Sequence, residues 1–275
     1  EVSKPLKAKD YSNTAITINS KRGDILDRNG NIVAISMPSW SLYKNKNQIY
    51  DIKNTTKILL QLIPELSENK LKKILNEDKN FQYIARHLAP NIAKKINKIG
   101  EPALNFEKEY LRVYPYNDEI SHIIGYLGTE KDGLAGVEKK YNNILNKGKN
   151  IHLTIDTRVQ FRVYQELIKG IDLYKYKAAV GIVLEINTGE VIAGVSLPSF
   201  DPNVYASFTP TKNQITNSVY EMGSIFKSFT IAAALNDNLV TNDSKFDVRE
   251  PLKLRGKTIT DYHGEDRILD LEEVF

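Results

Sequence analysis

The sequence contains no cysteine among its 275 residues. The lack of thiols excludes a disulfide-stapled scaffold and any metal site built on thiolates. Histidine is scarce as well, and the four that occur lie far apart, without the spacing of metal ligands: His87, His122, His152 and His263. We therefore expect no metal ion and no cofactor, and a structural role for each histidine.

The sequence also lacks long apolar runs and a strong excess of one charge. No stretch approaches the roughly 18 consecutive apolar residues that a membrane-spanning helix requires. No signal peptide opens the chain, which begins at Glu1 instead of methionine, so we expect that an N-terminal piece has been removed. The net charge of +4, from 38 Lys and Arg against 34 Asp and Glu, is milder than that of a typical nucleic-acid-binding domain. Nucleic acid is therefore not an expected partner.

What is present is a chain able to bury a core, since 41% of its residues are hydrophobic. Strand patterns at 15–18 and 32–35 flank a strong turn signal at 27–31. Residues 45–102 indicate a small helical insertion, with helices that begin near Asn54, Ser67 and Pro90. The many lysines of this insertion are most simply a solvated face, and partner binding is the rival interpretation.

The pattern changes at 147–150, which we interpret as a domain boundary. Thr157 and Gln160 fit a capping box at the start of an amphipathic helix. Two strands are expected at 179–186 and 191–195, joined by a hairpin turn. Both are apolar at nearly every residue, which predicts a central sheet covered on both faces. The predicted class is thus α+β, with domains at 1–148 and 149–275.

The candidate nucleophile is Ser224. The spacing Ser-x-x-Lys occurs three times, at Ser41, Ser67 and Ser224, and such pairs arise by chance in a lysine-rich chain. Ser67 precedes a polar helix as a cap would. Ser41 lies in a strand-like run, where the residue three positions on points to the other face. Only Ser224 combines a preceding glycine with a following apolar helix.

A helix that begins at Ser224 would place Lys227 one turn away on the same side. A neutral lysine there can take the proton of the serine hydroxyl and so activate it for attack. The free N–H groups of a helix N-terminus would favour the oxyanion of an acyl-transfer intermediate. We expect the apolar segment 231–235 to form a buried helix that holds the pair. The alternative is a capping serine with an exposed lysine.

Residues 220–230 resemble the active-serine segment of class B penicillin-binding proteins, whose motif set opens with Ser-x-x-Lys. Residues 22–30, 112–126 and 133–141 are similar to the three pedestal motifs of that family, and 196–203 resemble a loop of its transpeptidase domain. These matches follow the family order over almost the whole chain. The pedestal residues that carry the resemblance are Arg22, Gly23, Asp27, Arg28, Gly30, Arg112, Pro115, Gly136 and Glu138.

The resemblance implies an α+β fold with two domains. A mixed pedestal, or dimerisation-type, domain with its helical insertion would occupy 1–148. The first half of a transpeptidase domain of the penicillin-binding and β-lactamase type, an antiparallel sheet with helices on both faces, would occupy 149–275. The family's Ser-x-Asn and Lys-Thr-Gly motifs are missing, since Lys257 and Thr258 are followed by Ile259. We therefore expect a C-terminally truncated chain that holds half of an active site and is inactive alone.

The resemblance also implies a function. Ser224 would be the nucleophile and the site of penicillin acylation, and Lys227 its base, in a peptidoglycan D,D-transpeptidase that acts on D-Ala-D-Ala stem peptides and is inhibited by β-lactams. One N-terminal anchor in the inner membrane would leave the catalytic part in the periplasm. The form of the active-serine segment favours the division-specific branch, with other cell-division envelope proteins as partners, over the elongation-specific one.

Two alternatives remain open. A D,D-carboxypeptidase or β-lactamase would use water as the acyl acceptor, although the pedestal motifs argue against both. A non-catalytic envelope-binding module or β-lactam sensor would use the pedestal for docking. For the pedestal itself, we predict that the three motifs meet in space. At least one of Arg22, Arg28 and Arg112 should pair with Glu138, because Arg–carboxylate pairs have a fixed geometry suited to such a junction.

Overall fold

A computed structural model describes residues 21–45, 48–128, 131–204, 211–260 and 264–275; the strand expected at 15–18 lies outside them. The chain divides into two compact units, Glu1–Ser218 and Val219–Phe275, which we take in turn. The mixed α+β class expected from the sequence is confirmed. None of the described helices has the length and apolar character needed to cross a bilayer.

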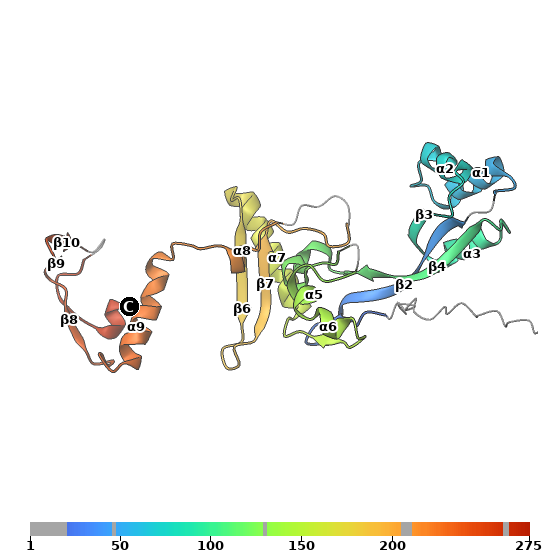
Figure 1. The fold of residues 1–275 in the computed structure, drawn as a ribbon. Helices are drawn as coiled ribbons and strands as arrows, with labels where there is room; N and C mark the ends of the chain where they lie inside the picture. Colours follow the sequence, from blue (N-terminus) through green and yellow to red (C-terminus); the bar gives the residue numbers. More distant parts are fainter. Residues whose placement is uncertain (1–20, 46–47, 129–130, 205–210, 261–263) are drawn as a thin grey trace, which may run out of the picture. The chain divides into compact units, whose positions relative to one another are not determined.

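The first unit is built on a long antiparallel ribbon (Figure 1). Its strands are β2 (Ile32–Asn45) and β4 (Leu104–Val113), which pair from Ile35–Val113 to Lys44–Leu104. At one end of the ribbon, β3 (Phe81–Leu88) pairs with β2. At the other end, β1 (Ile25–Leu26) pairs antiparallel with β2 and parallel with β5 (Ile151–His152). The chain beyond residue 150 therefore returns to the sheet on which it started.

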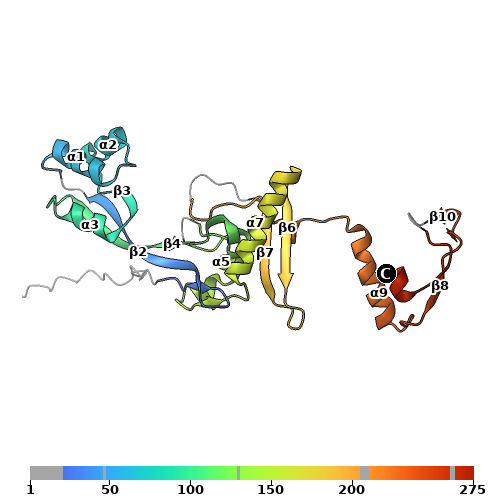
Figure 2. The ribbon, with the colours of Figure 1, turned by 180° about the vertical axis from the view of Figure 1, so that it is seen from behind.

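Three amphipathic helices surround the β3 end of the ribbon, as both views show (Figures 1 and 2). They are α1 (Ile52–Leu62), α2 (Glu68–Asn76) and α3 (Pro90–Asn97). Their apolar sides share a core with the sheet that includes Leu42, Leu59, Leu71 and Ile96. We call these helices, together with β3 and the adjoining ends of β2 and β4, the head.

The expected helical insertion is only partly correct, because β3 lies inside it. Strand β3 was missed since a bulge at His87, whose φ is +58°, breaks its alternation. The expected cap of α1 also shifts: Asp51 is the N-cap, and its carboxylate accepts a hydrogen bond from the Asn54 backbone N–H. Ser67 does occupy the N-cap position of α2, although its hydroxyl makes no capping bond.

The other end of the ribbon has a second core, formed by Ile25, Val33, Tyr114, Ile124 and Leu145 among others. Short helices close it. They are η1 (Asn117–Ile120), α4 (Ser121–Ile124), α5 (Gly136–Lys140) and α6 (Asn142–Leu145).

Beyond β5, the long helix α7 (Thr157–Tyr174) covers one face of a two-stranded hairpin, β6 (Ala179–Leu184) and β7 (Val191–Leu197), and α8 (Gln214–Asn217) follows. Gly181 permits the close approach, because a Cβ there would lie 2.8 Å from a methyl of Val163. The other face of the hairpin is only partly covered: α8 contacts both strands, and a Cβ on Gly194 would meet methyl groups of Ile123 and Ile215. On β6, Ile182 stays 50% exposed and Leu184 56% exposed. The expected cover on both faces is therefore incomplete over β6.

Helix α7 is capped by Asp156 and not by the expected box of Thr157 and Gln160. The Gln160 side chain is buried and bonds to the backbone of two other elements. Its Oε1 accepts from Gly194 N–H at 2.8 Å, and its Nε2 donates to the carbonyls of Gly194 at 3.0 Å and Glu119 at 2.8 Å. One glutamine thus fixes α7 to β7 and to η1.

The second unit holds the candidate nucleophile. It opens with η2 (Gly223–Phe226) and α9 (Lys227–Asn236). Two small antiparallel pairs and a terminal helix follow: β8 (Lys245–Asp247) with β11 (Ile268–Asp270), β9 (Leu252–Leu254) with β10 (Lys257–Ile259), and α10 (Leu271–Val274). The expected burial of α9 is wrong within this unit. None of its residues is buried.

Two pedestal glycines with positive φ allow a test of backbone strain against steric clash. Gly30 has φ +84° and open space around its Cα, whereas Gly136 has φ +55° and a Cβ there would lie 2.4 Å from the Ile123 carbonyl oxygen. We expect Gly30→Ala to lower the free energy of unfolding by about 1–2 kcal/mol, and Gly136→Ala to lower it clearly further. Urea unfolding of both variants measures this, and equal losses would contradict the close approach at Gly136.

Candidate functional site

The three pedestal motifs converge on one buried carboxylate, Glu138 of α5, whose side chain is 0% exposed. Arg22 donates from Nε to Glu138 Oε2 at 2.8 Å, and Arg112 donates from Nε to Oε1 at 2.7 Å. The Tyr114 hydroxyl donates to Oε1 at 3.3 Å. The predicted pairing is therefore confirmed for two of the three arginines. Arg28 instead pairs with Glu190 at 3.2 Å on the surface.

The two guanidinium groups also fix the surrounding backbone. Arg112 Nη1 donates to the Gly23 carbonyl at 2.8 Å, and a Cβ on Gly23 would lie 2.0 Å from the Lys149 carbonyl oxygen. Arg22 Nη1 donates to Asn142 Oδ1 at 2.7 Å and to Asn146 Oδ1. These two asparagines were not predicted from the sequence. Their signal was present, because they follow Glu138 at intervals of four residues and so lie on one side of a helical segment.

Asp27 joins the turn of the first motif to the start of α7. Its Oδ1 accepts from the backbone N–H groups of Asn29 and Asn31, both at 2.8 Å. Its Oδ2 accepts from Asn31 Nδ2 at 2.9 Å and from the Thr157 hydroxyl at 2.9 Å. Burial raises the pKa of Asp27, but the hydrogen bonds from Asn31 and Thr157 outweigh this effect and hold the pKa at about 2. Gly30, with positive φ, completes the turn.

The second motif contacts the loop at 196–203. Asn203 Oδ1 accepts from Tyr114 N–H at 2.9 Å, and Asn203 Nδ2 donates to the Tyr114 carbonyl at 3.0 Å. His122 Nε2 lies 3.0 Å from the Pro198 carbonyl oxygen, and the His122 ring meets Phe200 edge-on. Pro115 is exposed in the turn that leaves β4. The resemblance at 196–203 therefore falls on a segment anchored to the pedestal motifs.

Ser224 lies in the 3₁₀ turn η2, directly before α9, as expected for a serine that opens a helix. Gly223, with φ +56°, makes the entry to this turn possible. Lys227 is three residues on, and residues i and i+3 of a 3₁₀ turn lie on the same side. Both side chains are exposed. In the described part of the chain no hydrogen bond joins Ser224 Oγ and Lys227 Nζ.

The other two Ser-x-x-Lys pairs have structural roles. Ser41 is buried in β2, where its hydroxyl donates to Glu109. Lys44 points elsewhere and donates to the Glu77 carbonyl at 2.7 Å. Ser67 is the N-cap residue of α2. Ser224 is thus the one serine of the three that begins an apolar helix.

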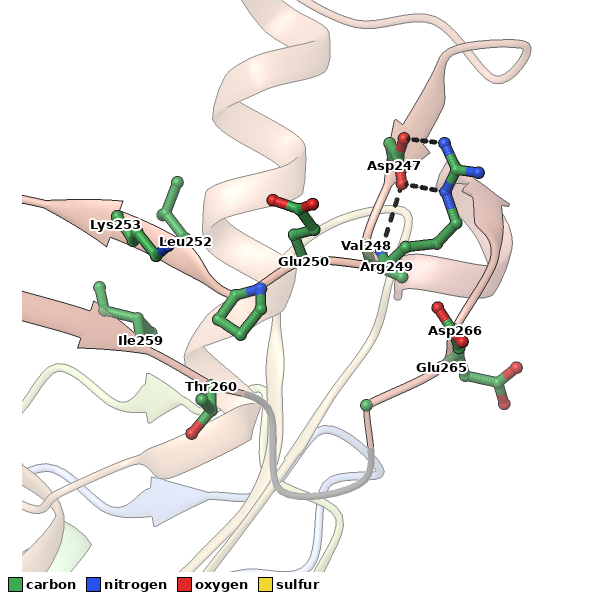
Figure 3. Close-up of a pocket in the computed structure, with 12 residues that line it drawn as sticks. Asp247, Val248, Arg249, Glu250, Leu252, Lys253, Ile259, Thr260, Glu265 and Asp266 are labelled. Atoms are coloured by element: carbon green, nitrogen blue, oxygen red, sulfur yellow. Dashed lines mark hydrogen bonds and ion pairs between the residues drawn. The ribbon is translucent and has the colours of Figure 1, made fainter.

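A cavity of about 560 Å³ is lined by the end of β8, residues 248–251, the β9–β10 hairpin and residues 264–266 (Figure 3). Its wall includes both polar and apolar residues, among them Glu250 and Asp266, while Asp247 accepts three hydrogen bonds from Arg249. Ser224 and Lys227 are not part of its wall. Among the described residues, no three His, Asp or Glu side chains gather closely enough to hold a metal ion.

Because two arginines pair with Glu138, we predict that neutralising this carboxylate strongly lowers the stability of the fold. In Glu138→Gln two buried guanidinium groups lose their counter-charge, which we expect to lower the free energy of unfolding by about 3–5 kcal/mol. Glu190→Gln removes the partner of Arg28 in an exposed pair and should cost less than about 1 kcal/mol. Chemical denaturation of both variants measures the difference, and a Glu138→Gln chain as stable as the wild type would contradict this account.

Asp27 predicts a pH dependence of stability. Its pKa is lowered on folding, so its contribution is fully present above about pH 4, the ordinary range of an Asp, and is lost as the pH falls towards 2. Asp27→Asn should therefore be less stable than the wild type at pH 7, and the gap should shrink between pH 4 and 2. Thermal unfolding across this range tests the prediction, and a gap that does not change with pH would refute it.

Comparison with known proteins agrees with this organisation. Residues 17–166 match the family model of the penicillin-binding protein dimerisation domain, and residues 179–275 match that of the penicillin-binding protein transpeptidase domain. The crystal structure of penicillin-binding protein 2X from Streptococcus thermophilus has a similar fold, with a TM-score of 0.65 and 18% identity over 89% of this chain and 45% of that one.

Curated relatives include a probable peptidoglycan D,D-transpeptidase FtsI from Caulobacter vibrioides, 35% identical over 265 residues that cover 94% of this chain and 45% of that protein. The peptidoglycan D,D-transpeptidase FtsI of Escherichia coli K12 is 27% identical over 279 residues, which cover 89% and 47%. The chain thus spans about half the length of these relatives. Because the dimerisation-domain model alone matches more than half of the 275 residues, and its motifs meet at Glu138, the chain belongs to the class B penicillin-binding protein family.

Proposed function

We propose that this chain belongs to a serine D,D-transpeptidase that cross-links peptidoglycan, with Ser224 as the nucleophile and Lys227 as its base. One observation carries the proposal: after Gly223, Ser224 lies in the turn η2 that leads into α9, and Lys227 follows one turn on. The match of residues 179–275 to the transpeptidase domain supports it, as do relatives named as D,D-transpeptidases.

The proposed reaction has two steps. Lys227 Nζ, in its neutral form, takes the proton of Ser224 Oγ while Oγ attacks the carbonyl carbon of the D-Ala-D-Ala peptide bond. The C–N bond then breaks, the leaving D-Ala amine takes a proton, and an ester on Ser224 remains. An amine of a neighbouring stem peptide attacks this ester and restores the hydroxyl. A β-lactam enters at the first step and leaves Ser224 acylated.

The exposed setting of Lys227 sets a condition on this mechanism. A lysine serves as a base only where burial or neighbouring positive charge favours its neutral form. The described residues of the second unit leave both Ser224 and Lys227 exposed. The acylation rate of this chain should therefore be low compared with that of a site in which the pair is enclosed.

The relatives named FtsI support a role in the division septum over one in elongation. We propose stem peptides as substrates, β-lactams as inhibitors, and other cell-division envelope proteins as partners. The proposed location is the periplasmic side of the inner membrane, with an N-terminal anchor. A non-catalytic binding module would keep the Glu138 cluster and the pedestal but show no acylation, and the following experiment separates the two.

Incubation with a fluorescent penicillin, followed by intact-mass spectrometry, tests the nucleophile. We expect a slow, single adduct on the chain, carried by Ser224, and no adduct on Ser224→Ala. Ser67→Ala is the matched control, since it removes a serine of the same Ser-x-x-Lys spacing, and it should label like the wild type. An adduct on Ser224→Ala would move the nucleophile elsewhere, and a wild-type chain that never labels would favour the non-catalytic module.

A further inference from the structure

The head carries the positive surplus of the whole chain. Residues 48–102 contain ten Lys and Arg against six Asp and Glu, a surplus of four, which equals the net charge of +4 for all 275 residues. The rest of the chain is therefore balanced. Such a local surplus of positive charge attracts anionic partners. The position of the charges on the fold indicates which class of anionic partner they fit.

Five lysines of α1 and α3 make up what we call the basic face: Lys53, Lys57, Lys94, Lys95 and Lys98. All five are exposed, and none forms an ion pair in the part of the chain that the structure describes. Neighbouring lysines of the head behave differently, because Lys72 pairs with Glu68 and Lys79 pairs with Glu77. The basic face is thus not neutralised from within the head.

The geometry concentrates these charges. Lys53 and Lys57 are four residues apart on α1, as are Lys94 on α3 and Lys98 at its C-cap, so each pair lies on one side of its helix. The two helices pack against each other, and neither contains an acidic residue. Two acidic residues adjoin these lysines in sequence, Asp51 before α1 and Glu101 after α3. Both accept backbone N–H groups, Asp51 from Asn54 and Glu101 from Tyr50 and Ala103.

An aromatic residue, Tyr50, lies next to the start of α1. Tyr50 directly precedes the cap of α1, and its backbone N–H donates to Glu101 Oε2 at 3.0 Å. This bond joins the start of α1 to the segment that follows α3. Its side chain is 87% exposed. Tyrosine beside lysine is the combination found where proteins meet the head-group region of a bilayer.

We propose that the basic face binds the anionic phospholipid head groups of a membrane surface, with Tyr50 at the interface. Lysines are compact point charges suited to a diffuse anionic layer, and the basic face has no arginine whose planar fork would select individual phosphates. The charges are spread over two helices and do not line a groove, which suits a surface better than a single bound chain. This inference does not depend on the acyl-transfer chemistry of Ser224.

Co-sedimentation of the 275-residue chain with vesicles tests the proposal. The vesicles contain phosphatidylcholine with about one-third phosphatidylglycerol, and pure phosphatidylcholine vesicles serve as the reference. We expect binding to the anionic vesicles only, with an affinity that falls as salt is raised from about 0.05 to 0.5 M. Exchange of the five lysines of the basic face for glutamine should weaken binding at least about tenfold. Tyr50→Ser should weaken the binding that remains at high salt.

The matched control exchanges five exposed, unpaired lysines outside the head for glutamine, which gives the same net charge: Lys139, Lys140, Lys147, Lys175 and Lys177. It should bind like the wild type. If both variants lost the same amount of vesicle binding, net charge alone would explain the binding, and the proposal would be overturned. Binding to soluble dextran sulfate without binding to anionic vesicles would overturn it in favour of an anionic polymer. Circular dichroism of each variant confirms that the fold is kept.

Discussion

A carboxylate without access to water, Glu138, requires positive partners at close range, since a buried charge left unpaired is strongly destabilising. Here the partners come from far along the chain: Arg22 is 116 residues away and Arg112 is 26 residues away. Each guanidinium also bonds to backbone or amide oxygens around it. The three pedestal motifs are therefore one structural element, and each is needed to satisfy the others.

The remaining connections of the first unit extend from this cluster. The Gly23 carbonyl accepts a hydrogen bond from Arg112. Two residues later, β1 begins its parallel pairing with β5. Asp27 is joined to the start of α7 by a hydrogen bond from the Thr157 hydroxyl. Asn203 accepts a hydrogen bond from the Tyr114 backbone N–H. Helix α7 and the hairpin β6–β7 are thus bonded to the pedestal motifs within one compact unit. Strand β5, directly after the domain boundary expected near residue 148, pairs with β1, and the position of that boundary stays a prediction.

The parts of this fold that could be predicted from sequence are those that a short segment or an ion pair determines. The turn after Asp27, the hairpin after Leu184 and the pairing of Glu138 with arginine are of this kind. Strand β3 was missed because its bulge at His87 hides the alternation, and Gln160 was misassigned as a cap because its partners, Gly194 and Glu119, are distant in sequence. The incomplete cover of β6 was not predicted, because an apolar strand has the same sequence pattern whether both of its faces are fully covered or only one.

The active-serine segment shows the same division between local and tertiary information. Gly223 and the helical preference of the residues after it suffice to place Ser224 and Lys227 on one side of a turn, so the relative position of the proposed nucleophile and base is encoded within about five residues. These five residues do not determine the reactivity of the pair. A neutral lysine and a stabilised oxyanion need low polarity and further donors, which only packing from other segments provides. The motif therefore points to Ser224 as the proposed nucleophile, while the reactivity of that serine depends on the surroundings that enclose it.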